Sequence, residues 1–271
     1  MVEEGFARVG LPLLGMVRAD KAMEMPSRHL GLVQTRETGE LDSRIAAIAD
    51  HVGSQCDLDA IFKAAAPTKD AACQPATIRP PGQRIAVARD SAFSFFYLHL
   101  ARWWRAAGAE LCFFSPLANE APPADCDACW LPGGYPELHA GRIATNARFL
   151  SGLRAFAAHH PVHGECGGYM VLGRSLEDAD GGVHAMAGLL PVEMSFAKRR
   201  MTLGYRKATL RKDTRFASAG QLLLGHEFHY ATIVASDSMP LADMADAQDQ
   251  VLPPAGHRNG DVTGGFFHLI A

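Results

Sequence analysis

The chain has 271 residues, of which 48% are hydrophobic and 20% charged, and its formal net charge is −3. This composition is ordinary for a globular protein of one or two domains. No basic block indicates a nucleic-acid partner, and no apolar run approaches the ~20 residues of a membrane span. The acidic start, Met1 to Gly5, is unlike a signal peptide, so we expect a cytoplasmic protein with reduced cysteines.

Residues 1–66 hold little apolar sequence. They contain a short apolar run from Val9 to Val17 and one Ala/Ile-rich segment that predicts a helix over about 41–52. That is too little for an independent hydrophobic core. Residues 67–83 break every period and are rich in proline, which predicts a linker.

The rest of the chain alternates between strand and helix patterns. Buried parallel strands are expected at 85–88, 111–114, 128–131 and near Val162, with helices over 93–107 and 143–159. We expect an antiparallel extension over 183–232, a long polar loop over 236–260 and a final strand over 264–270. This order predicts an α/β fold with a doubly wound, mostly parallel sheet, whose active site lies at the carboxyl ends of the strands.

Cys166 stands in the pattern Gly-Glu-Cys-Gly-Gly over 164–168, between the strand near Val162 and an apolar helical segment. This is the nucleophile-elbow pattern with cysteine as the nucleophile. Glycine neighbours avoid clashes at a strained turn, and the positive end of the next helix is expected to favour the thiolate. A buried structural cysteine beside a glycine-rich turn is the alternative.

A thiolate nucleophile needs a base and donors for an oxyanion. His268 stands on the final strand and is the candidate base. Gly133 and Gly134 follow the strand at 128–131, and their N–H groups, with that of Gly167, are candidates for an oxyanion hole. A simple tight turn at Gly133-Gly134 is the alternative.

Two other patterns are weaker. Cys126 and Cys129 match C-x-x-C, but no second pair exists for zinc, so we expect both to be buried beside a strand. His226 and His229 are three apart, which in a strand places them on opposite faces and argues against a shared metal. We therefore expect no metal site.

Several segments together resemble the cobyrinate/hydrogenobyrinate a,c-diamide synthase family. They are 28–32, 86–90, 93–95, 131–137, 165–168, 225–230 and 266–268, and they extend over nearly the whole chain. The resemblance implies a class I-type glutamine amidotransferase domain at 84–271, with Cys166 as nucleophile and His268 as its base.

The resemblance also implies a role in cobalamin biosynthesis. Ammonia from glutamine would serve the ATP-dependent amidation of the a and c carboxylates of cobyrinate or hydrogenobyrinate. Magnesium-ATP would be needed by the complete enzyme, and no cofactor by the amidotransferase domain. A homodimer is possible. Residues expected to contact the substrate are Arg28, His29, Arg199, Arg206 and His229.

The chain departs from the family in its first 66 residues. Relatives begin with an ATP-binding domain that carries a phosphate loop, but no Gly-Lys-Ser or Gly-Lys-Thr occurs here. We expect residues 1–66 to be the C-terminal remnant of that domain. The chain alone is then expected to be only the glutaminase half, and the ATP-binding half would be a partner.

A second feature concerns the catalytic acid. Amidotransferases with a full triad place Glu two residues after the catalytic His, but position 270 is Ile270. Relatives in this family are similar in lacking that Glu, so a Cys-His dyad is expected, or an acid from elsewhere, with Glu165 and Glu227 as candidates. Two other functions remain open: a non-catalytic binding or regulatory module, and a cysteine hydrolase on the same fold.

Overall fold

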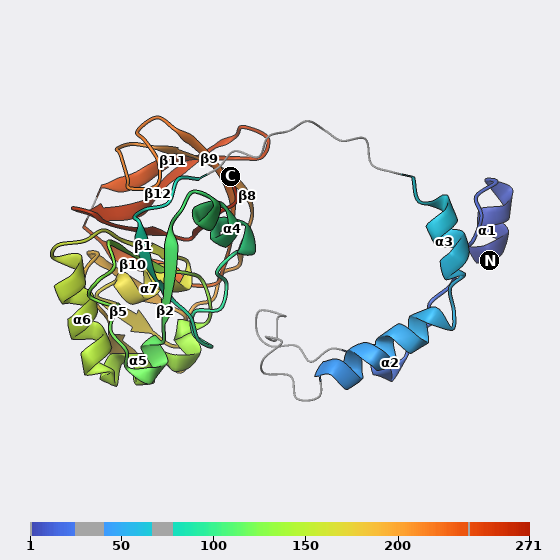
Figure 1. Cartoon of the computed structure of the whole chain (residues 1–271), viewed down its shortest axis with the longest axis horizontal. Helices are drawn as coiled ribbons and strands as arrows, with labels where there is room; N and C mark the ends of the chain where they lie inside the picture. Colours follow the sequence, from blue (N-terminus) through green and yellow to red (C-terminus); the bar gives the residue numbers. More distant parts are fainter. Residues whose placement is uncertain (1, 25–40, 67–77, 238) are drawn as a thin grey trace. The chain divides into compact units, whose positions relative to one another are not determined.

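The computed structural model describes residues 2–24, 41–66, 78–237 and 239–271 (Figure 1). The chain divides into two compact units, Met1–Cys73 and Gln74–Ala271. The first unit contains α1 (Val2–Arg8), η1 (Lys21–Met23), α2 (Leu41–Gly53) and α3 (Leu58–Ala64). The predicted helix over 41–52 is confirmed by α2.

The first unit has no buried side chain among its described residues. It is held by local hydrogen bonds, such as that from the Ala60 N–H to the Asp57 carboxylate at 2.9 Å, which caps α3. An isolated bridge joins Gly15 to Cys56. The identity of the first unit as a remnant of an ATP-binding domain stays a prediction. Residues 67–77 of the predicted linker lie outside the described residues.

The second unit is built on a ten-stranded mixed sheet in the order β14-β9-β8-β11-β12-β13-β4-β3-β1-β2. Its parallel strands are β1 (Arg84–Ala88), β2 (Glu110–Phe114), β3 (Ala128–Leu131), β4 (Val162–Glu165) and β13 (Val262–Gly265). The antiparallel strands are β8 (Thr202–Leu210), β9 (Leu222–His229), β11 (Pro240–Asp246), β12 (Val251–Asn259) and β14 (Phe267–Leu269). The predicted α/β class is confirmed, and the sheet is mixed rather than mostly parallel because the antiparallel strands join the parallel ones.

Most helices of this unit lie between consecutive parallel strands of the chain, and α7 follows β4. The helices are α4 (Leu98–Ala106), η3 (Pro116–Ala118), η4 (Pro136–His139), α5 (Ala140–Thr145), α6 (Ala147–Ala157) and α7 (Gly167–Leu172). A smaller sheet has the order β10-β7-β5-β6, with β5 (Ser175–Glu177), β6 (Val183–Ala185), β7 (Val192–Ser195) and β10 (Thr232–Ser236). None of the described helices is long and apolar enough to cross a membrane.

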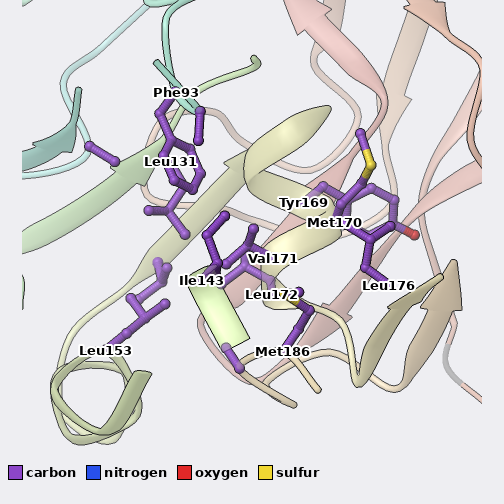
Figure 2. Close-up of a cluster of buried hydrophobic side chains, with 14 of the residues drawn as sticks. Phe93, Leu131, Ile143, Leu153, Tyr169, Met170, Val171, Leu172, Leu176 and Met186 are labelled. Atoms are coloured by element: carbon purple, nitrogen blue, oxygen red, sulfur yellow. The ribbon is translucent and has the colours of Figure 1, made fainter. Parts of the chain in front are cut away.

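Hydrophobic clusters cover both faces of the sheet. Alternate residues of β1 enter different clusters, Ala86 one and Val87 the other, because successive side chains of a strand point to opposite faces. Figure 2 shows the cluster that contains α7, with Tyr169 to Leu172 beside Ile143 of α5. The helix that follows Cys166 is therefore anchored in the core.

Two predicted helices have different bounds in the structure. The helix expected over 93–107 begins at Leu98, because the preceding residues form a loop in which Phe95 pairs with Gly133. The helix expected over 143–159 is two helices, α5 and α6, which meet at Asn146. The Asn146 side chain donates to the Pro116 carbonyl at 2.8 Å, which holds the break.

The prediction of a long loop over 236–260 is wrong. Most of this segment is the antiparallel pair β11 and β12. Pro253 and Pro254 lie in β12, and their missing N–H groups obscured the strand. The ladder accommodates them with a register shift between Ala242 and Met244. The final strand predicted over 264–270 is likewise two strands, β13 and β14, separated at Phe266.

Candidate active site

Cys166 occupies a sharp turn between β4 and α7. Its backbone has φ 46° and ψ −101°, and it is one of three described non-glycine residues with positive φ. Such a conformation is strained for a residue with a side chain and is typical of a nucleophile elbow. The turn is held on both sides: the Cys166 N–H donates to the Gly265 carbonyl at 2.8 Å, and its own carbonyl accepts from the Met170 N–H at 3.0 Å. The predicted strained turn is confirmed.

The glycines beside Cys166 are required by close backbone contacts. A Cβ atom at Gly164 would lie 2.7 Å from the amide nitrogen of Tyr169. A Cβ atom at Gly167 would lie 2.9 Å from the amide nitrogen of Gly134. A side chain at either position would therefore push the elbow away from its neighbours, as the sequence pattern predicts.

The structure gathers the predicted catalytic groups at the carboxyl ends of β3 and β4. His268, on β14, is only 2% exposed. A Cβ atom at Gly133 would lie 2.6 Å from Cε1 of His268, so the imidazole lies directly against the Gly133 backbone. Gly134 in turn lies against Gly167, the residue after Cys166. The Gly133-Gly134 turn thus contacts both the elbow and the candidate base.

This turn is fixed by the loop that precedes α4. The Phe95 N–H donates to the Gly133 carbonyl at 3.0 Å, and the Tyr135 N–H donates to the Ala92 carbonyl at 3.0 Å. These bonds tie the turn to residues 92–95. Its role as an oxyanion hole, with the N–H of Gly167, stays a prediction.

The Cys166 thiol is buried and donates to the Phe228 carbonyl at 3.9 Å. Burial raises the pKa of the Cys166 thiol, and the neighbouring Glu137 raises it further, whereas the Gly167 N–H lowers it. The N–H at the start of the following helix favours the thiolate, as expected, but the net shift of the thiol pKa is upward. Removal of water outweighs the helix start, and α7 has only six residues.

The pKa of the His268 imidazole shifts in the opposite direction. Burial lowers the pKa of His268 to about 3, and the nearby His226 and His229 lower it too. At neutral pH the free site therefore contains a neutral imidazole and a protonated thiol. A neutral imidazole can accept the thiol proton when the sulfur attacks a substrate.

No carboxylate completes a triad among the described residues. Nδ1 of His268 is buried without a hydrogen-bond partner in the described part of the chain, and Ile270 stands where a triad Glu would be. Of the two candidate acids, Glu165 bonds to the backbone of β14 and Glu227 pairs with Arg206. Cys166 and His268 are thus a candidate Cys-His dyad, whose pairing stays a prediction.

Two of the predicted substrate contacts lie beside the dyad. Arg206 donates to Glu227 at 2.7 Å, and both side chains are 12% exposed. Glu227 is close enough to Cys166 to raise the pKa of the thiol, after the effects of burial and of other carboxylates. His229 stacks on Phe266, with ring centroids 3.7 Å apart.

The remaining predicted contacts are not brought to the site. Arg199 is exposed in the loop between β7 and β8. Arg28 and His29 lie outside the described residues. Cys126 and Cys129 are buried free thiols, and Cys129 lies within β3, as predicted. No group of three or more His, Cys, Asp or Glu side chains that could hold a metal ion occurs in the described ranges.

The sequence did not single out two residues of the site, Tyr97 and Glu137, and it did not predict the contacts of His226. Tyr97, just before α4, has its hydroxyl 2.8 Å from Nε2 of His226, and His226 stacks on His268. Glu137, buried near Cys166, follows the Gly133-Gly134 turn in the 131–137 segment, which was the available signal. No local signal marks Tyr97, because its contact joins segments more than 100 residues apart.

The mixed sheet with a cysteine elbow at the end of a parallel strand defines a glutamine amidotransferase-type α/β domain. Residues 84–271 match the family model described as the CobB/CobQ-like glutamine amidotransferase domain. The chain belongs to this family. The family resemblance noted in the sequence is thereby confirmed.

Curated relatives are similar along the whole chain. The hydrogenobyrinate a,c-diamide synthase of Agrobacterium fabrum (strain C58 / ATCC 33970) is 54% identical over 99% of this chain and 62% of its own length. The protein of the same name from Mesorhizobium japonicum is 52% identical over 97% of this chain and 60% of its own length. The chain thus spans about three fifths of these relatives.

A solved structure titled as the crystal structure of a glutamine amidotransferase matches 68% of this chain and 89% of its own. The sequence identity is 15% and the TM-score 0.43.

Proposed function

We propose that this chain is the glutaminase part of a hydrogenobyrinate or cobyrinate a,c-diamide synthase. In this role it hydrolyses glutamine to glutamate and ammonia, and the ammonia amidates the a and c carboxylates of the corrinoid. The observation that carries the proposal is the strained elbow at Cys166, with His268 and the Gly133-Gly134 turn around it. The named relatives support the choice of corrinoid substrate.

The chemistry follows from the charge states of the free site. His268 accepts the Cys166 proton as the sulfur attacks the carboxamide carbon of glutamine. Backbone N–H groups near Gly134 and Gly167 stabilise the oxyanion. The carbon–nitrogen bond breaks, and ammonia leaves with the proton from His268. Water, deprotonated by His268, then attacks the thioester and releases glutamate and the thiol.

We assign activation of the corrinoid carboxylate to a partner half of the enzyme and not to this chain. In the family this step uses magnesium-ATP, but the described residues of the first unit contain only helices and an isolated bridge. They therefore supply no strand-loop-helix in which a phosphate loop could sit. The proposal places ATP binding in a partner half, in a cytoplasmic and possible homodimeric enzyme, and derives no step through ATP from this chain.

The test of the glutaminase role is direct. The purified chain should release glutamate from glutamine, slowly in the absence of an ATP-binding half. A glutamine-analogue alkylator should label Cys166, and Cys166→Ala should abolish both glutamate release and labelling. Cys112→Ser, a change at a half-buried free thiol, serves as the matched control. Labelling at Cys126 or Cys129, or full activity of Cys166→Ala, would contradict the proposal.

A further inference from the structure

Glu165 places a buried carboxyl group between the strand that leads to the nucleophile and the strand that carries the base. It is the last residue of β4, directly before Cys166, and has no exposed surface. Its Oε1 accepts from the Leu269 N–H at 3.0 Å, and its Oε2 accepts from Nε1 of Trp130 at 3.3 Å. Leu269 directly follows His268. One side chain therefore connects the two halves of the dyad.

The backbone of β14 needs this acceptor. β14 lies at the end of the strand order and pairs only with β9 among the described strands. The Ile270 N–H donates to the Leu224 carbonyl on the β9 side, so the preceding N–H, that of Leu269, points to the opposite edge. A buried N–H without an acceptor is destabilising, and the Glu165 carboxyl takes the place of a neighbouring strand.

Stability alone does not explain an ionisable group in this place. Burial raises the pKa of Glu165 to about 7, and the hydrogen bonds from Leu269 and Trp130 oppose that shift. Removing a carboxyl group from water is unfavourable, and an apolar or amide side chain would avoid much of that penalty. A carboxyl group differs from these in offering two acceptors at once, one for each strand.

We propose that Glu165 is a positioning residue, whose carboxyl group fixes the strand that carries His268 relative to the Cys166 elbow. It acts through the backbone of Leu269 and does not touch the imidazole, since Nδ1 of His268 has no partner in the described chain. The activity readout rests on the proposed glutaminase function. The placement of His268 itself can be measured without it.

The first test compares Glu165→Leu with a structural control. Glu165→Leu leaves the Leu269 N–H without its acceptor, so β14 should shift. A displacement of about 1 Å in a catalytic group can lower rates about 10²-fold, so kcat for glutamine should fall by that order while KM changes little. The control Thr263→Val removes the part-buried 2.8 Å hydrogen bond between Thr263 and His163, which involves β13 and β4 but not β14. It should lower stability without lowering kcat.

The second test uses rescue within the hydrogen-bond set. Glu165→Gln presents one oxygen and one NH2 group to two N–H donors, so either Leu269 or Trp130 loses its acceptor. Trp130→Phe removes one of these donors. The double variant Glu165→Gln/Trp130→Phe should therefore recover most of the kcat of Trp130→Phe, whereas Glu165→Leu/Trp130→Phe should not. Equal kcat values for the two double variants would overturn the proposal. If Glu165→Leu fails to fold, Glu165→Gln is compared with Glu165→Gln/Trp130→Phe instead, and a kcat no higher in the double variant would overturn the proposal.

The third readout is independent of catalysis. The imidazole NMR signals of His268 should shift or broaden in Glu165→Leu and stay unchanged in Thr263→Val. Unchanged His268 signals in Glu165→Leu would overturn the positioning role whether or not the chain hydrolyses glutamine. If the wild-type chain releases no glutamate but the signals shift as expected, the proposed function fails and the positioning role stands.

Discussion

The imidazoles of His226 and His268 are stacked, with ring centroids 4.8 Å apart and ring planes 6° apart. The register of β9 and β14 places the two residues directly opposite each other, and the Tyr97 hydroxyl lies 2.8 Å from Nε2 of His226. A proton on either ring would bring a positive charge against the other in a buried site. The stack therefore favours a neutral His268, which is the form that a general base requires.

Replacing His268 should remove the base while leaving the binding of glutamine nearly intact. His268→Asn should lower kcat for glutamine hydrolysis by about 10²- to 10⁴-fold, with a small change in KM. Steady-state kinetics of glutamate release measure this. His184→Asn, which changes a 2.6 Å hydrogen bond with Asp178 in the smaller sheet region, is the control. A loss no larger than that of the control would refute the assignment of His268.

A methyl group at Gly133 should act through the same imidazole. Its Cβ atom would lie 2.6 Å from Cε1 of His268 and 3.4 Å from the Phe95 ring, so the histidine must move. We expect Gly133→Ala to lower kcat by roughly 10-fold or more, because the base is displaced from its productive geometry. Gly53→Ala, with nothing within 4 Å of the added atom, should have no effect. Equal activities of the two variants would show that the turn and His268 are not coupled.

The stability of the chain should contain a pH-dependent contribution from Glu165. Burial raises the pKa of Glu165 from 4.5 to about 7, so the folded chain keeps a proton that the unfolded chain has already released between these values. The contribution of Glu165 to the free energy of unfolding is fully present below pH 4.5. It decreases as the pH rises through about 7, by about 3 kcal/mol at most.

Denaturant unfolding at several pH values checks this sign. The free energy of unfolding of the wild type minus that of Glu165→Gln should decrease from about pH 5 to about pH 8, because the glutamine does not titrate. The same substitution at an exposed glutamate of β2, Glu110→Gln, provides the comparison. A difference that is constant or increases with pH would contradict the shift at Glu165.

The chain alone should not form the diamide. Amidation of a carboxylate requires activation, and the described part of the first unit offers no phosphate loop. Incubation with ATP, magnesium, ammonium and hydrogenobyrinate or cobyrinate should leave the corrinoid unchanged by mass. Addition of the part of the Agrobacterium fabrum relative that this chain does not span should allow formation of the a,c-diamide. Diamide formed by the chain alone would show that residues 1–66 have been misread.

Much of the parallel core could be predicted because its signals are local. The strands at 85–88, 111–114 and 128–131 are short apolar runs between helical segments, and β1, β2 and β3 follow them closely. The elbow could be predicted equally well, since a cysteine between glycines directly after a strand is typical of a nucleophile turn. The loop predicted over 236–260 failed because Pro253 and Pro254 mask a strand that depends on pairing with β11.

The sequence by itself determined the elbow at Cys166, the positions of four parallel strands and the family. Only the tertiary structure decided which residues pack around the candidate dyad and how burial shifts the pKa values of its two side chains. Tyr97, His226 and Glu165 reach His268 or its strand from distant segments, and no local pattern records such contacts. Burial reversed the expected shift in the pKa of the Cys166 thiol, because the removal of water depends on every element packed around the sulfur and not on the residues beside it in the chain.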